Sequence, residues 1–247
     1  MTLDDITVLS PETARGVLRV VLDRPLQRNA MTWPMVRSLF AVLESEAGRN
    51  AGAILLSGEG KGFCAGSDLK ELAGMSVRER SLFEADCGRL SRAIVAHSRP
   101  VVAEVSGFAI GGGLTLAAAC DIVVTAPDAK WSLPEVPIGL FPAWGLGPVR
   151  LRTGPAFARR LSFGIDTFDG REAQESGLAD IVCDDPRRIA AETAEKLAQL
   201  PTEQVAAVKE YFASDPAGEE ADRHANRLFA HASESEDAKR SFSRFAR

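Results

Sequence analysis

The chain has 247 residues, 45% of them hydrophobic, and a formal charge of −5 at pH 7. This length suits one large α/β domain, or one domain with a smaller appendage. Because the net charge is negative, the chain as a whole does not attract a polyanion, and nucleic acid is therefore disfavoured as the main partner. The most apolar stretch, residues 101–124, is interrupted by Glu104, several glycines and Asp121, and is therefore not expected to span a membrane.

The first residues carry acids where a signal peptide would need a basic region and an apolar run. The four cysteines show no paired spacing: Cys64, Cys87, Cys120 and Cys183. Both features predict a cytoplasmic protein with reduced thiols, and the same lack of pairing argues against a zinc site.

Apolar segments alternate with helical ones along most of the chain. Residues 16–23 predict an early strand, and a helix follows over residues 32–43, with Thr32 as its N-cap and Pro34 in its first turn. The later strands are expected at residues 51–57, 101–105 and 121–125, and the later helices at residues 76–97 and 114–120. This order predicts an α/β fold with parallel strands.

Beyond about residue 187 the pattern becomes helical and charged. We expect an α/β core over residues 1–187 and a helical region over residues 188–247. Breaks at Pro201 and at Asp215 to Gly218 divide that region into three predicted helices.

Two glycine runs, residues 58–68 and 107–113, each follow a predicted strand and lead into a predicted helix. Neither matches a dinucleotide-binding or P-loop pattern. A single run would usually mark only a tight turn or close packing. Two runs at matching places instead predict free backbone N–H groups that face each other and can bind an oxyanion.

Further motifs follow in a fixed order: Leu22 to Pro25 with Asn29-Ala30, Phe63 to Lys70, Arg99 to Ala103, Gly107 to Asp121, Leu133 to Gly139, and Ala173 to Val182. Together they resemble the crotonase (enoyl-CoA hydratase/isomerase) superfamily over nearly the whole chain. The resemblance implies a crotonase-like spiral of ββα repeats with a C-terminal helical trimerisation region. It also implies a homotrimer or a dimer of trimers. The expected substrate is an acyl-CoA thioester, with no cofactor beyond the coenzyme A that the substrate carries.

The resemblance implies that the N–H groups of Ala65 and Gly112 bind the thioester oxygen as an enolate forms, and that Glu135 moves the proton. Glu135 lies among Leu133, Pro134, Val136, Pro137 and Ile138. Such neighbours remove water from the carboxylate and raise its pKa toward neutrality, where proton transfer is most effective.

Thr115 departs from the family pattern, because typical hydratases resemble Gly-Gly-Gly-x-Glu-Leu at this place. A single glutamate favours Δ3→Δ2 enoyl-CoA isomerisation, which needs only one base. Single-glutamate hydration of a 2-enoyl-CoA is the main alternative. Three further alternatives remain: a carrier-bound acyl dehydratase or decarboxylase, a non-catalytic acyl-CoA sensor, and an RNA-binding protein. The alternative for Thr115 is a purely structural role, in which its hydroxyl donates a hydrogen bond back to a carbonyl of its own helix. Trp144 is expected either to wall off the acyl pocket or simply to pack in the core.

The remaining predicted substrate-binding residues fall into two groups. The cations expected near the phosphates are Arg24, Arg28 and Lys70, joined by the tail residues Lys239, Arg240 and Arg244. Phe245 is expected to reach a neighbouring subunit's substrate. The predicted lining is Cys64, Gly66, Asp68, Leu69, Gly111, Pro134 and Leu140. Within it, Asp68 is expected to cap its turn, and Cys64 to pack as a small side chain because no histidine in the matching motifs can activate it.

Overall fold

The computed structural model describes residues 2–3, 5–9, 16–213, 223, 226–227, 229–230, 233–234 and 236–246. Its strands are β1 (Thr2–Leu3), β2 (Ile6–Leu9), β3 (Val17–Leu22), β4 (Ala53–Gly58), β5 (Val101–Val105), β6 (Phe108–Ile110), β7 (Ile122–Thr125), β8 (Lys130–Ser132) and β9 (Ile181–Val182). Its helices are η1 (Pro25–Gln27), α1 (Trp33–Glu44), α2 (Glu46–Asn50), α3 (Leu69–Gly74), α4 (Val77–Ala96), α5 (Gly112–Ala118), η2 (Val136–Ile138), α6 (Leu146–Ser162), α7 (Gly170–Glu175), α8 (Pro186–Ala198), α9 (Thr202–Ala213) and α11 (Glu236–Phe245).

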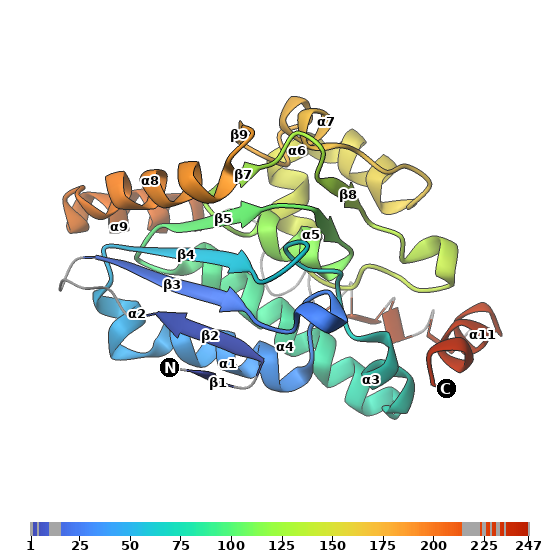
Figure 1. Ribbon diagram of the computed structural model, residues 1–247. Helices are drawn as coiled ribbons and strands as arrows, with labels where there is room; N and C mark the ends of the chain where they lie inside the picture. Colours follow the sequence, from blue (N-terminus) through green and yellow to red (C-terminus); the bar gives the residue numbers. More distant parts are fainter. Residues whose placement is uncertain are drawn as a thin grey trace.

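The main sheet runs in the order β1-β2-β3-β4-β5-β7-β9 (Figure 1). Pairing is parallel from β3 to β9, which confirms the predicted parallel strands. The antiparallel edge formed by β1 and β2 is an addition that the sequence reading did not include. The predicted strands at residues 16–23, 51–57, 101–105 and 121–125 are β3, β4, β5 and β7.

A second, two-stranded sheet pairs β6 with β8 in parallel. The glycine turn after β4 reaches the same layer, because Cys64 forms a bridge to Ala109 of β6. Each repeat therefore adds one strand to the large sheet, a short extended segment to the small one, and then a helix. This arrangement confirms the predicted α/β spiral of ββα repeats.

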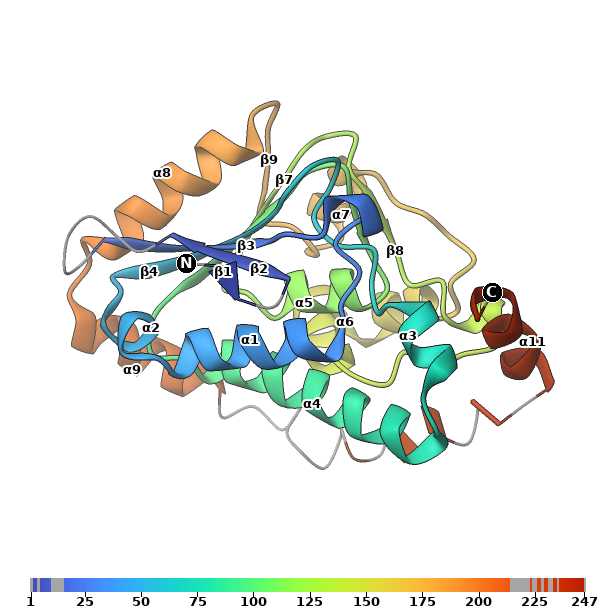
Figure 2. The ribbon, with the colours of Figure 1, turned by 60° about the horizontal axis from the view of Figure 1, so that its bottom comes forward.

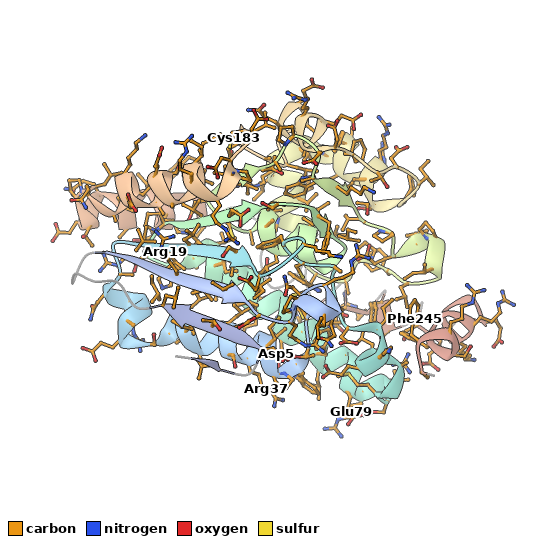
Figure 3. The ribbon with its side chains drawn as sticks, viewed as in Figure 1. Asp5, Arg19, Arg37, Glu79, Cys183 and Phe245 are labelled. Carbon is orange, nitrogen blue, oxygen red and sulfur yellow. The ribbon has the colours of Figure 1, made fainter. Side chains whose placement is uncertain are left out.

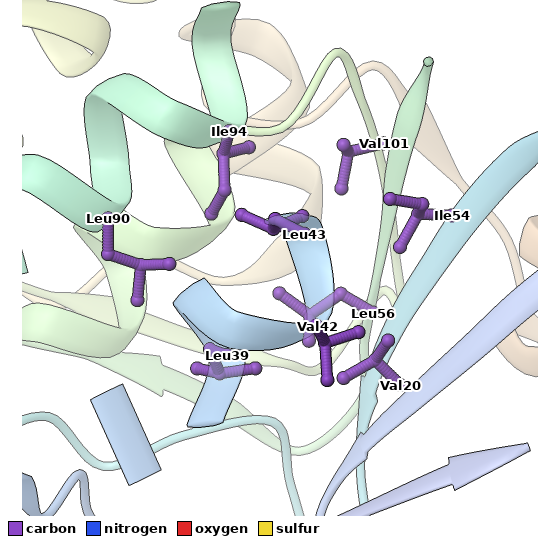
Figure 4. A pocket seen from close by; sticks show the side chains of 9 residues that line it. All are labelled: Val20, Leu39, Val42, Leu43, Ile54, Leu56, Leu90, Ile94 and Val101. Carbon is purple, nitrogen blue, oxygen red and sulfur yellow. The ribbon is translucent and has the colours of Figure 1, made fainter. Parts of the chain in front are cut away.

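Helices cover both faces of the main sheet (Figure 2). One face packs against α1 and α4 in the larger hydrophobic core, and the other packs against α8 through a smaller cluster. Strand β5 is buried along its whole length, as expected for a central parallel strand. Figure 4 shows an entirely apolar pocket between α1, α4 and the sheet, lined by Leu39, Leu56, Leu90 and six further aliphatic side chains.

The predicted helix starts agree with the observed caps. The Thr32 hydroxyl accepts a hydrogen bond from the N–H of Met35 at 3.2 Å, which caps α1. Ser76 and Glu79 form a capping box at the start of α4. These local signals fix where α1 and α4 begin.

The boundary expected between residues 187 and 188 falls in the first turn of α8. Helix α8 packs on the main sheet, and α9 packs against α4. The buried ammonium of Lys209 in α9 holds this second contact, since it donates to Asp121 at 2.7 Å and to the carbonyl of Ile94 at 3.0 Å. The division into two domains stays a prediction.

Pro201 separates α8 from α9 as expected, whereas the predicted break at Asp215 to Gly218 lies outside the described residues. Helix α11 packs against α3 and η2 of the same chain. The trimerisation role assigned to the C-terminal helices stays a prediction. In the part of the chain that the structure describes, no helix combines the length and the apolar character needed to cross a membrane.

Candidate active site

A pocket opens where the two glycine turns meet α3, α4 and the loop before η2. It is lined by Ala65, Gly66, Ser67, Leu69, Leu72, Glu84, Ile110, Gly111, Gly112, Pro134, Glu135, Ile138, Leu140, Phe141 and Phe229. The lining is mostly apolar, apart from two carboxylates, Ser67 and the backbone of the turns. The structure thus brings together the predicted residues Gly66, Leu69, Gly111, Gly112, Pro134, Glu135 and Leu140.

Glu135 lies directly against the second glycine turn. A Cβ atom added to Gly111 would lie 2.7 Å from the Oε1 atom of Glu135. Gly111 has a φ of +57°, which favours glycine, and its N–H donates to the carbonyl of Ser132 at 2.8 Å. The strand β8 and the turn before α5 are therefore tied together, and this contact places the Glu135 carboxylate beside the start of α5.

The carboxylate of Glu135 is poised for proton transfer. Its Oε2 atom is buried and has no hydrogen-bond partner among the described residues. Burial raises the pKa of Glu135 from 4.5 to about 7. A carboxyl group of this pKa is present in both protonation states near neutral pH, so it can accept a proton and return it.

Two backbone N–H groups face the pocket close to this carboxylate. Gly112 is the first residue of α5, so its N–H has no partner within the helix. Ser67 forms a parallel bridge with Met31, in which the N–H of Met31 bonds to Gly66 and the N–H of Asp68 bonds to Met31. The N–H of Ser67 itself therefore points away from Met31. No hydrogen bond joins the N–H of Ser67 or of Gly112 to any other described residue.

These two donors lie close together. A Cβ atom on Gly112 would lie 3.6 Å from the nitrogen of Ser67, and a Cβ atom on Gly66 would lie 3.2 Å from the nitrogen of Gly112. Gly66 has a φ of +93°, and its lack of a side chain keeps the space between the two N–H groups open. The arrangement can receive one oxygen atom that carries negative charge.

The prediction that Ala65 supplies one of these donors is wrong. Its N–H donates to the carbonyl of Arg28 at 3.1 Å, so it is already engaged. The free donor lies two residues further along, at Ser67. In a regular extended segment the N–H groups of Ala65 and Ser67 would point the same way, but Gly66 between them has a φ of +93°, which breaks the regular strand and turns the N–H of Ser67 in another direction. The sequence gives no direct sign of this shift, since it depends on which strand the turn pairs with.

Asn29 holds the first glycine turn in place and was not singled out as a site residue. It is fully buried, and its Nδ2 atom lies within hydrogen-bond distance of the carbonyls of Glu59, Gly62 and Phe63. Its Oδ1 atom accepts from the N–H of Arg24 at 3.0 Å. One side chain thus fixes the backbone that leads to Ser67.

Glu84 is the second carboxylate of the pocket, and sequence reasoning missed it. It belongs to α4, is only 5% exposed, and lines the same pocket as Glu135. Burial, followed by the repulsion of Glu135, raises the pKa of Glu84 to about 8. The signal in the sequence is its spacing from Cys87 and Ser91, which places a glutamate on the buried face of a long helix.

Thr115 and Trp144 do not line the pocket. The Thr115 hydroxyl donates to the carbonyl of Gly112 at 3.1 Å, which confirms the expected structural hydrogen bond within the helix. Trp144 is 4% exposed and packs in the main core, with its ring edge 2.9 Å from where a Cβ atom on Gly112 would lie. It therefore supports the turn from behind rather than walling off the pocket.

Several predicted binding residues have structural partners. Asp68 caps α3 by accepting from the N–H groups of Lys70 and Glu71, as expected. It also pairs with Arg24 at 3.0 Å, and Arg24 pairs with Asp5 at 3.4 Å. Arg24 is thus committed to bracing the N-terminal strands, which argues against its predicted role at the phosphates.

Cys64 packs as a small buried side chain, as expected. Its thiol donates to the carbonyl of Asn29 at 3.1 Å, and burial raises its pKa to about 12. Arg28 and Lys70 are exposed at the surface, and the Arg28 guanidinium lies 4.3 Å from the ring centre of Phe108. Their role at the phosphates of a coenzyme A thioester substrate stays a prediction.

The tail helix α11 lies beside α3 and η2 of its own chain, at the C-terminal end of the molecule in Figure 1. The tail cations Lys239, Arg240 and Arg244 are exposed, and Phe245 is 36% exposed at the helix end (Figure 3). A role for Phe245 at a neighbouring subunit stays a prediction. Among the described residues, no three His, Cys, Asp or Glu side chains gather as a metal site would require.

The chain matches the family model described as enoyl-CoA hydratase/isomerase over residues 12–247. It is 37% identical over 195 residues to a probable enoyl-CoA hydratase of Rhizobium meliloti (strain 1021), covering 76% of this chain and 74% of that protein. A probable enoyl-CoA hydratase of Bacillus subtilis (strain 168) is 33% identical over 226 residues, with 88% and 87% covered. Among solved structures, an enoyl-CoA hydratase/isomerase from Mycobacterium paratuberculosis is similar with a TM-score of 0.87 and 26% identity, covering 97% of this chain and 98% of that one.

Proposed function

The chain belongs to the enoyl-CoA hydratase/isomerase family, and from that membership we propose that it binds an enoyl-CoA thioester and moves a proton at C2 of the acyl chain. The N–H groups of Ser67 and Gly112 receive the thioester oxygen, and Glu135 exchanges the proton. One observation carries this proposal. The unpartnered Oε2 atom of Glu135 lines the same pocket as two unpaired backbone donors.

The reaction that needs only these groups is Δ3→Δ2 isomerisation. Glu135 takes a proton from C2, and the electron pair of that C–H bond moves toward the thioester oxygen to form an enolate. The enolate then collapses: a double bond forms between C2 and C3, the C3–C4 double bond opens, and Glu135 returns its proton to C4. Atoms and charge balance, and the carboxylate is regenerated.

The backbone donors supply the main electrostatic stabilisation of the enolate. Removing one such donor in comparable sites raises the barrier by about 3–4 kcal/mol. The donors are held in advance, because Ser67 is fixed by the bridge to Met31 and Gly112 by the start of α5. Little reorganisation is then needed as charge develops on the oxygen.

Hydration of a 2-enoyl-CoA is the second candidate, and the names of the relatives favour it, since those from Rhizobium meliloti and Bacillus subtilis are both called probable enoyl-CoA hydratases. It uses the same enolate and the same Glu135. In addition it needs a group that takes a proton from water as the water oxygen bonds to C3.

The test is incubation of the purified protein with 3-hexenoyl-CoA and, separately, with crotonyl-CoA in D₂O, followed by mass spectrometry. Conversion of the first to 2-hexenoyl-CoA with deuterium incorporation, abolished by Glu135→Gln, is the expected result. If Glu135→Gln retained the wild-type rate of isomerisation and of deuterium exchange at C2, the assignment of Glu135 would be refuted.

We further propose that the protein assembles as a homotrimer or a dimer of trimers. Support comes from α9, where Val208, Tyr211 and Phe212 are 58%, 75% and 69% exposed. The four cysteines are free thiols, consistent with a cytoplasmic protein. Light scattering on the purified protein measures the assembly directly, and a monomeric mass would contradict the proposal.

A further inference from the structure

Glu84 occupies a position where the fold itself has no use for a carboxylate. The buried face of α4 is otherwise formed mainly by apolar and small side chains, among them Phe83, Cys87, Leu90 and Ile94. No hydrogen bond and no ion pair joins the Glu84 carboxylate to another described residue. Burying a carboxyl group without a partner is costly, and an apolar side chain of similar size would pack there without that cost.

Away from the pocket, the buried glutamate and the buried lysine of the described residues have structural partners. Glu104 is 2% exposed on β5, and its carboxylate accepts a hydrogen bond from the Ser106 hydroxyl. Lys209 is 6% exposed, and it is paired with Asp121. Glu84 has no such partner and faces the pocket instead, so its place in the structure points to a ligand.

The raised pKa values of the two carboxyl groups of the pocket favour one proton on the pair between about pH 7 and pH 8. Burial is the main cause that raises the pKa of Glu84, and the negative charge of Glu135 adds to it, so that the pKa reaches about 8. The Cys87 thiol, one turn further along α4, stays neutral because burial raises its pKa well above 9. With Glu135 at about 7, the favoured form has Glu135 ionised and Glu84 protonated.

We propose that Glu84 is a second catalytic acid–base residue, which exchanges a proton with the oxygen at C3 and so lets the enzyme interconvert 3-hydroxyacyl-CoA and 2-enoyl-CoA. The proposal rests on the proposed function, because it uses Glu135 and the same pair of N–H donors. Thr115 leaves α5 without the glutamate that typical hydratases carry there. Glu84 supplies a carboxylate to the same pocket from α4.

In the dehydration direction, ionised Glu135 takes the proton from C2, and the electron pair forms the enolate held by Ser67 and Gly112. The enolate then collapses to the C2–C3 double bond, the C3–O bond breaks, and protonated Glu84 gives its proton to the departing hydroxyl, which leaves as water. Hydration is the reverse: ionised Glu84 takes a proton from water as its oxygen bonds to C3, and protonated Glu135 gives its proton to C2. One molecule of water is released or consumed, and proton exchange between the two carboxyl groups restores the starting form.

The experiment compares three rates in each variant: hydration of crotonyl-CoA, isomerisation of 3-hexenoyl-CoA, and deuterium exchange at C2 of butyryl-CoA, which has no double bond. The variants are Glu84→Gln, Glu84→Asp and Glu135→Gln. Glu104→Gln is the matched control, because it replaces an equally buried glutamate that faces α8 on the other side of the sheet. We expect Glu84→Gln to lower hydration by about 10²–10⁴-fold, the usual contribution of a general acid or base, and to lower C2 exchange far less. Glu84→Asp keeps the carboxylate and should recover part of the lost hydration.

The pH dependence gives an independent readout. Dehydration of 3-hydroxybutyryl-CoA needs Glu135 ionised and Glu84 protonated, so its rate should rise through about pH 7 and fall above about pH 8. In Glu84→Gln the fall at high pH should disappear from the residual rate. A purely structural role for Glu84 would leave the shape of this profile unchanged.

The outcomes separate the two proposals. The role of Glu84 is overturned if the wild type does not hydrate crotonyl-CoA, if Glu84→Gln lowers all three rates equally, or if it lowers none of them. Each of these leaves the isomerase and Glu135 intact, provided that Glu135→Gln abolishes C2 exchange. If every variant, Glu135→Gln included, kept the deuterium exchange at C2, that result would instead refute the proposed function itself.

Discussion

Replacing Glu135 by Gln should stabilise the folded protein, and the gain should grow with pH. The Glu135 carboxyl group has a pKa of about 7 when folded, against 4.5 for an exposed glutamate. The folded state therefore binds this proton more tightly than the unfolded state. The contribution of Glu135 to the free energy of unfolding is highest below pH 4.5, and it falls as the pH rises toward and through about 7, because folding must then bury a charged carboxylate.

The size of the effect follows from the shift. A rise in the pKa of Glu135 from 4.5 to about 7 on folding lowers the free energy of unfolding at pH 8 by roughly 3 kcal/mol, relative to a glutamate with no shift. Glutamine carries no charge, so the variant escapes this loss. It also removes the repulsion that acts on Glu84, which works in the same direction. We thus expect the free energy of unfolding of Glu135→Gln, relative to wild type, to increase by about 3 kcal/mol between pH 4.5 and pH 8.

Urea unfolding of both proteins at a series of pH values, followed by circular dichroism, measures this difference. The control is Glu79→Gln at the exposed start of α4, where the Ser76 cap lowers the pKa of the carboxyl group. Glu79 is then ionised in both the folded and the unfolded state above pH 4.5, so the stability difference between this variant and wild type should stay nearly constant between pH 4.5 and pH 8 and change only at lower pH. A difference between Glu135→Gln and wild type that stays constant from pH 4.5 to pH 8 would refute the reasoning, because it would mean that Glu135 titrates like an exposed glutamate.

Three further predictions concern the turns and the buried polar groups. Gly66→Ala should lower kcat by about 10²–10³-fold, since the new methyl group would crowd the N–H of Gly112 at 3.2 Å; wild-type kcat in a folded variant would contradict this. Asn29→Asp should lower the free energy of unfolding by about 3 kcal/mol or more, because a carboxylate would face the carbonyls of Glu59, Gly62 and Phe63, and unchanged urea denaturation would argue against it. Lys209→Met should cost about 1–3 kcal/mol by leaving the Asp121 carboxylate without its ion-pair partner, and adding Asp121→Asn should restore part of that loss, which a double-mutant cycle in thermal unfolding measures.

Much of the fold could be predicted because its signals are local. The strands β3, β4, β5 and β7 are runs of aliphatic residues, and α1 begins at a Thr32 cap that any reader of the sequence can find. The short strands β6, β8 and β9 have only two or three residues each, too few for a periodic pattern. The antiparallel edge of β1 and β2 depends on pairing with β3 across a loop, which local pattern does not specify.

By itself the sequence determined that two glycine turns end neighbouring strands, and that Glu135 lies among apolar residues. Only the tertiary structure decided which N–H groups are free: pairing with Met31 turns the N–H of Ser67 toward the pocket, whereas Arg28 occupies that of Ala65. The same holds for Glu84, which no motif contains. Helix packing carries it to the pocket of Glu135, some fifty residues away along the chain, because burial and charge depend on what a folded chain places around a side chain.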